Sequence, residues 1–108
     1  MNLSDLQAVF VKWVDPHHRQ LVETLAEADG VKFLCPKCFA ENGGAVGVHS
    51  IICWSPEVPQ DTFPTPGRWS MQGASLTDLT LVAGPSSVLL TGGCQAHFFV
   101  RNGQIEMC

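Results

Sequence analysis

Long apolar runs and basic residues are scarce in this chain of 108 residues. No run of about eighteen apolar residues occurs, which excludes a membrane-spanning helix. The ten Asp and Glu residues outnumber the six Lys and Arg residues, giving a net charge of −4, so we expect no nonspecific nucleic-acid binder with a basic patch. Charged residues make up only 15% of the chain and hydrophobic residues 45%, which excludes a disordered tail.

Common catalytic and targeting signatures are also missing. The sequence has no Walker-type glycine loop, no assignable Ser/His/Asp trio and no His-x-Glu of the zinc-deaminase type, so we assign no catalytic residue. The segment Met1 to Val14 carries Asp5 and has neither a basic start nor a small-residue cleavage site. We therefore expect no secretory signal and a cytoplasmic location.

The cysteines are the residues that remain to be explained, and they are Cys35, Cys38, Cys53, Cys94 and Cys108. An odd number of cysteines without a secretory signal suits a reducing compartment, where thiols stay free or bind a metal.

Short segments rich in β-branched and aromatic residues alternate with turn residues along the chain, which predicts a mainly β fold. The expected strands are Leu6–Val14, Val31–Cys35, Val46–Trp54, Arg68–Met71, Leu76–Val82, Ser86–Thr91, His97–Arg101 and Gln104–Cys108. Asn102-Gly103 between the last two predicts a two-residue hairpin turn. A chain of this length forms one modest core, so we expect a single domain over residues 1–108, a small β-sandwich or barrel-like fold with at most one or two short helices.

Three segments depart from this pattern. Leu6–Val14 also fits helical spacing, so a short amphipathic helix is the alternative there. The stretch His17 to Gly30 is expected to be helical near its end, where Thr24 and Glu27 match a capping box. Ser55 to Gly67, called the proline loop below, contains four prolines and predicts a surface loop.

Two short motifs, Cys35-x-x-Cys38 and Cys94-x-x-His97, share one geometry. Two intervening residues let a tight turn direct both side chains at one ion, and two such pairs meet the needs of tetrahedral zinc. Because 55 residues separate Cys38 from Cys94, an ion would join the middle of the chain to its last hairpin. The sequence therefore predicts a metal site made of Cys35, Cys38, Cys94 and His97.

Energetic arguments make this predicted metal structural. Clamping a loop of about 60 residues restricts the unfolded chain by roughly 4 kcal/mol, by analogy with a disulfide. Apparent zinc-binding energies in small peptides are about 10–16 kcal/mol, whereas a whole domain is stable by about 5–15 kcal/mol. Four filled ligand positions leave no place for a metal-bound water, which argues against a metal-dependent hydrolase.

Two other interpretations of the motifs stay open. The cysteines can be buried free thiols beside a hydrogen-bonded histidine. Cys35 and Cys38 can also form a redox dithiol, which needs a helix starting at the first cysteine to lower its pKa. The residues after this pair, Phe39 to Gly44, favour a turn over a helix.

Several other residues have both a structural and a functional interpretation. His49, on a predicted strand, is either a packed histidine or a further ligand or base. Cys53 is expected in the core. Trp54, Arg68 and Trp69 flank the proline loop, where they either cover the core or line a groove for a protein partner.

The cysteine motifs resemble a family of small uncharacterised proteins encoded by phages, prophages and bacteria. The matching residues are Phe33 to Phe39, Asn42 to Gly44, Gly47 to Ser50, Arg68-Trp69, Gly73, Leu76, Asp78, Leu79, Cys94, His97, Phe99 and Asn102-Gly103. The resemblance implies a metal-binding β domain without an assigned activity.

A second resemblance concerns Cys94-x-x-His97 with Phe99 and the glycine turn after it, which is similar to the second ligand box of Rieske 2Fe–2S domains. The first Rieske box is Cys-x-His, where this chain has Cys35-x-x-Cys38. The resemblance implies either a Rieske-like electron carrier or a Rieske-like or rubredoxin-like scaffold that holds one zinc ion.

Together these observations predict a small non-enzymatic zinc-binding protein with an accessory role and a protein partner. In a phage context it would act in the host cytoplasm. A 2Fe–2S electron-transfer protein and a metal-dependent hydrolase are the alternatives.

Overall fold

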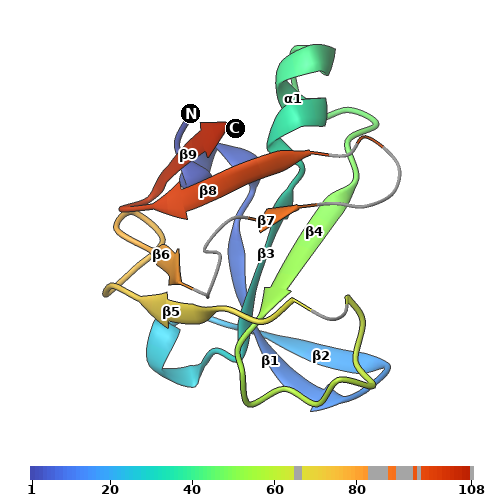
Figure 1. Cartoon of the computed structure of the whole chain (residues 1–108), viewed down its shortest axis with the longest axis vertical. Coiled ribbons are helices and arrows are strands. Elements are labelled where there is room, and N and C mark those ends of the chain that lie inside the picture. Colours follow the sequence, from blue (N-terminus) through green and yellow to red (C-terminus); the bar gives the residue numbers. More distant parts are fainter. Residues whose placement is uncertain (65–66, 83–87, 90–93, 95, 108) are drawn as a thin grey trace.

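The structure, a computed structural model, describes residues 1–64, 67–82, 88–89, 94 and 96–107 (Figure 1). Within this part of the chain the strands form three antiparallel sheets, none of which closes into a barrel. The prediction of a mainly β fold with few helices is confirmed.

The largest sheet has four strands in the order β2-β1-β3-β4. Its strands are β1 (Val9–Asp15), β2 (His18–Val22), β3 (Gly30–Leu34) and β4 (Ser50–Trp54). β3 lies inside the sheet and is buried along almost its whole length, as expected for a strand covered on both faces. β4 pairs with it so that Leu34 lies opposite Ser50, a register that places the ends of these strands at the candidate metal centre described below.

Two smaller sheets complete the fold. β5 (Ser70–Gln72) pairs with β6 (Thr80–Val82), and β8 (His97–Arg101) lies between β7 (Val88–Leu89) and β9 (Gln104–Met107). The predicted hairpin turn between β8 and β9 is confirmed, because Asn102 and Gly103 both have positive φ, at 50° and 72°. A Cβ at position 103 would lie 2.1 Å from the Thr77 carbonyl oxygen, so this turn requires glycine.

The helix α1 (Pro36–Asn42) corrects the expectation of a turn after Cys38. Pro36 occupies a first-turn position, where its missing N–H costs no hydrogen bond. Gly43 ends the helix with a φ of 69°, and its N–H donates to the Phe39 carbonyl. These end signals stabilise a helix whose interior residues predict it only weakly. No helix in the described residues is long and apolar enough to cross a membrane.

A helix was expected near the end of His17 to Gly30, but the structure has only one short helical turn there. Part of this stretch is strand β2, and the rest contains a single 3-10 turn, η2 (Leu25–Glu27). The Thr24 hydroxyl donates to the Glu27 carboxylate at 2.8 Å and makes no capping bond to the backbone. The strand interpretation of Leu6–Val14 is confirmed from Val9 onward, after the 3-10 helix η1 (Leu3–Leu6).

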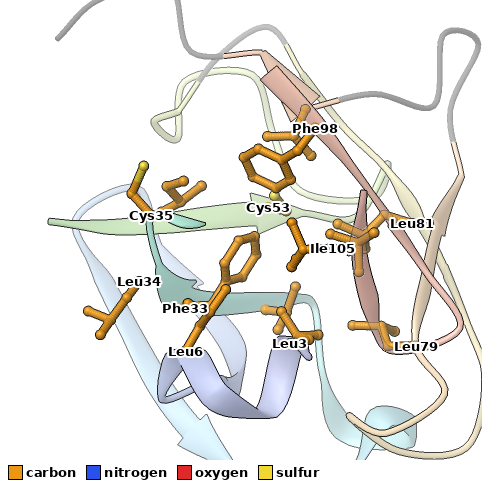
Figure 2. Packing of buried hydrophobic residues seen from close by; sticks show 14 of the residues in the cluster. Leu3, Leu6, Phe33, Leu34, Cys35, Cys53, Leu79, Leu81, Phe98 and Ile105 are labelled. Atoms are coloured by element: carbon orange, nitrogen blue, oxygen red, sulfur yellow. The ribbon is translucent and has the colours of Figure 1, made fainter. Parts of the chain in front are cut away.

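One main core joins the four-stranded sheet to the three-stranded sheet (Figure 2). Phe33 of β3 meets Phe98 of β8 edge to face, with ring centroids 6.0 Å apart. Leu3 and Leu6 of η1 are fully buried in the same cluster. This core brings β3 and β8 together, and with them the segments that carry the cysteines.

A smaller cluster on the other face of the four-stranded sheet contains Val11, Trp54 and Val58. Val58 belongs to the proline loop, whose described residues are bends and turns rather than strand or helix. The prediction of a surface loop is therefore confirmed for these residues.

Candidate metal centre

Three separate segments converge at one end of the β3–β4 pair. Cys35 follows β3 and precedes α1, Cys38 lies in the first turn of α1, His49 directly precedes β4, and Cys94 precedes β8. The four side chains form one group of metal-ligating residues.

Local backbone structure explains how these residues meet. The antiparallel register of β3 and β4 continues past the strand ends, where the Cys35 N–H donates to the His49 carbonyl at 2.9 Å. Helix α1 then turns the chain back, and the Phe39 N–H donates to the Cys35 carbonyl at 2.9 Å. The start of the helix thus brings Cys38 close to Cys35, and the strand pairing brings His49 close to both.

The distances between the ligand atoms suit one ion. The group offers one ligand atom from each residue, and all four atoms lie within 4.8 Å of one another. The Cys35 and Cys94 sulfurs are 3.4 Å apart, and the His49 Nε2 is 3.4 Å from the Cys94 sulfur. A tetrahedral ion with Zn–S bonds of about 2.3 Å places two sulfur ligands about 3.8 Å apart. The group could therefore hold a metal ion with small side-chain movements.

Burial changes sharply across the group. Cys35 is fully buried at the margin of the main core, Cys38 and Cys94 are half-buried, and His49 is exposed. An open hollow beside the group is lined by Cys38, Glu41, Asn42, Gly47 and Val48. Solvent therefore reaches the group beside Cys38 and His49.

Lys37 supplies a further link between the segments. Its Nζ donates to the Cys94 carbonyl at 2.7 Å, across 57 residues of sequence. This bond ties Cys94 to α1 and places a positive charge beside the Cys94 backbone carbonyl.

The thiols titrate very differently. Burial alone would raise the pKa of Cys94, but hydrogen bonds from His49 and Cys35 lower it to about 6. Hydrogen bonding to Cys94 is the main cause that raises the pKa of Cys38, to about 12, and burial raises the pKa of Cys35. These opposite shifts make Cys94 the most acidic of the three thiols.

The structure brings three of the four predicted ligands together, Cys35, Cys38 and Cys94, with His49 beside them. Among the described residues His97 does not belong to this group. It is the first residue of β8, where Phe98 and Val100 face the core, so alternation along the strand directs His97 to the opposite face.

A signal for His49 was present in the sequence. Both β3 and β4 were predicted as strands, and an antiparallel pairing that sets Leu34 opposite Ser50 also sets Cys35 opposite His49. The missing information was the register of that pairing, which the sequence alone leaves open because both strands are buried on both faces for part of their length.

The structure meets one requirement of the redox-dithiol interpretation, a helix that starts at the first cysteine, but not the other, a lowered pKa of that cysteine. Helix α1 begins directly after Cys35, contrary to the expected turn. Burial nevertheless raises the pKa of Cys35, whereas the first cysteine of a redox dithiol needs a lowered pKa.

The remaining residues singled out from the sequence have structural contacts. Cys53 is buried in the main core, as expected, and burial raises the pKa of its thiol. Trp54 is buried, and its indole N–H donates to the Phe63 carbonyl at 2.9 Å. The Arg68 guanidinium donates to the backbone carbonyls of Val58, Pro59, Thr62, Pro64 and Gly67. These side chains hold the proline loop in shape, and a partner groove at this loop stays a prediction.

Comparisons with known proteins add no family to this description. No protein-family model, no curated protein and no solved structure matches this chain. The argument for function therefore depends on the site itself.

Proposed function

We propose that this protein binds one zinc ion through Cys35, Cys38, Cys94 and His49, and that the ion is structural. The observation that carries this proposal is the meeting of four ligand atoms within 4.8 Å of one another, from segments far apart in sequence. Three thiols and one imidazole are a common ligand set of structural zinc sites.

Ligand spacing favours a single ion over the alternative 2Fe–2S cluster. A 2Fe–2S cluster binds its protein ligands on two different iron atoms, so ligands of different irons lie farther apart than ligands that share one ion. The 3.4 Å distances from the Cys94 sulfur to Cys35 and to His49 fit one shared ion.

Ligand number supports a structural role over a hydrolytic one. Four protein ligands fill a tetrahedral zinc site and leave no position for the bound water that hydrolysis needs. The ion would also join Cys35 to Cys94, two residues that are 59 positions apart in the sequence. On this proposal the protein acts through its folded surface rather than by catalysis. That suits an accessory role, which a phage or prophage context would fit, and the protein partner predicted at the proline loop.

Elemental analysis of the protein purified under reducing conditions tests the proposal. We expect a colourless protein with one zinc per chain. His49→Ala should lose most of its zinc, whereas the matched variant His97→Ala should keep it. A brown protein that contains iron and has visible absorption bands would contradict the zinc proposal, and zinc loss only in His97→Ala would contradict the ligand set.

A further inference from the structure

We propose that Cys35 and Cys94 form a thiol pair that a peroxide oxidises to a disulfide when the metal leaves. This inference rests on the proposed function, because the bound metal is what would keep the two sulfurs from reacting. It assigns to the same site a second, redox-dependent way of joining two distant parts of the chain.

The contact between the two sulfurs carries the inference. They are 3.4 Å apart, and a disulfide bond is about 2.05 Å long, so they must approach by a little more than 1 Å. Cys35 is the residue before α1, whereas Cys94 lies on a separate segment that reaches α1 through Lys37. An approach of Cys94 by that distance would bring the two sulfurs into bonding distance.

The difference in burial assigns the order of events. Cys94 is half-buried and lies beside the exposed His49, so a small oxidant can reach it from solvent. Cys35 is fully buried, and its sulfur contacts the sulfur of Cys94. Cys94 is therefore the thiol that reacts with the oxidant, and Cys35 is the one that resolves the product.

The chemistry needs one equivalent of hydrogen peroxide and proceeds in two steps. The Cys94 thiolate attacks a peroxide oxygen, the O–O bond breaks, and Cys94 sulfenic acid and hydroxide form. The Cys35 thiol then loses its proton as its sulfur attacks the Cys94 sulfur, the S–O bond breaks, and the leaving hydroxide takes up that proton and departs as water as the disulfide forms. The hydroxide from the first step takes up a proton from solvent to give water, so one thiolate and one thiol are oxidised and one peroxide is reduced.

The cross-link would take over the role of the ion. It closes the same chain segment, from residue 35 to residue 94, and so restricts the unfolded chain in the same way. We therefore expect the oxidised metal-free protein to melt at a higher temperature than the reduced metal-free protein.

Peptide mapping of the full-length protein tests the pairing. The protein is stripped of zinc with a chelator, treated with one equivalent of hydrogen peroxide, alkylated and digested with trypsin. Cleavage after Lys32, Lys37, Arg68 and Arg101 places Cys35 in the peptide 33–37, Cys38 and Cys53 in 38–68, and Cys94 in 69–101. We expect the main cross-link to join peptides 33–37 and 69–101, and zinc-loaded protein to form at least tenfold less of it.

Variants make the outcome decisive. Cys38→Ala should still form the link between 33–37 and 69–101, as should the control Cys53→Ala, whereas Cys94→Ala should not. A main cross-link between 33–37 and 38–68, or no intramolecular cross-link in the wild-type protein, would overturn the inference. The zinc proposal fails separately: a chain that forms the Cys35–Cys94 link but binds no zinc contradicts only the proposed function, and a chain that binds zinc but forms another link contradicts only this inference.

Discussion

Two regions of this molecule hold irregular chain in place, and they do so by opposite means. The proline loop is gathered around the Arg68 guanidinium, which donates to five backbone carbonyls within 3.0 Å. The candidate metal centre gathers three cysteines and His49, all of which can act as ligands for one cation. In the first region the cation is the Arg68 side chain, and in the second we propose that it is a bound zinc ion.

The two regions differ in how their stability depends on pH and on a bound metal. Backbone carbonyls and a guanidinium do not change charge in the physiological pH range, so the proline loop is complete once Arg68 is in place. Thiols must lose protons before they bind a metal, so binding of the proposed zinc ion depends on pH. Predictions that separate the two regions follow from this difference.

Removal of the metal should have the largest effect. A metal contribution of only about 4 kcal/mol would lower the Tm by about 15–30 °C in a domain of this size, and zinc sites in small peptides contribute more. Calorimetry with and without chelator measures this change. In hydrogen exchange, α1 and β8 should lose protection before the described proline-loop residues. Equal loss in both regions would show that they are not independent.

The zinc affinity should rise steeply with pH. The lowered pKa of Cys94, about 6, leaves this residue as a thiolate at neutral pH, while the raised pKa values of Cys35 and Cys38 keep both protonated. Binding should therefore release about two protons per ion near pH 7–8, and affinity should increase about 100-fold per pH unit. Competition titrations against a chelator at several pH values measure the slope. An affinity independent of pH would contradict the assignment of two protonated thiols.

Loss of the Arg68 guanidinium should affect only the proline loop. Arg68→Met removes charge-assisted hydrogen bonds to the loop carbonyls, and we expect a loss of about 2–3 kcal/mol in the stability of the loop. Limited proteolysis should cut the proline loop much faster than in wild type, while the zinc content stays at one per chain. Arg19→Met, at an exposed position of β2, is the matched control. Zinc loss in Arg68→Met would break the separation between the regions.

The smallest effect should follow loss of the Lys37 contact. Lys37→Met removes the bond from Nζ to the Cys94 carbonyl, which connects α1 to a ligand without itself binding the metal. We expect zinc affinity to fall about tenfold, equivalent to roughly 1.4 kcal/mol, while the Tm of the metal-free protein changes little. Lys12→Met, on an exposed position of β1, should bind zinc as wild type does. An unchanged affinity in Lys37→Met would show that the contact does not position Cys94.

Local signals in the sequence predicted much of the fold. The Asn102-Gly103 turn was predictable because two adjacent positive φ angles select these residue types. Strands β3 and β4 were predictable from their β-branched and aromatic residues. Helix α1 was not, because its stability comes from its ends, Pro36 and Gly43, rather than from its interior.

The candidate site was predictable only in part. The spacing of ligands within one short motif can be read from the sequence, but the meeting of ligands from distant segments depends on the fold. Cys35 and Cys38 are close in sequence, so a turn or a helix start brings them together in either case. His49 meets Cys35 through strand register, which the sequence pattern did not fix. His97 satisfied the spacing rule, but it begins a strand whose alternate residues face the core, and this directs it to the other face.

X-ray absorption at the zinc edge of the full-length, zinc-loaded protein is the most direct test of the central claim that three thiols and one imidazole share one ion. The account predicts a first shell of three sulfurs at about 2.3 Å and one nitrogen at about 2.0 Å, with the nitrogen lost in His49→Ala and retained in His97→Ala. A shell with fewer than three sulfurs, or a nitrogen that persists in His49→Ala, would contradict it.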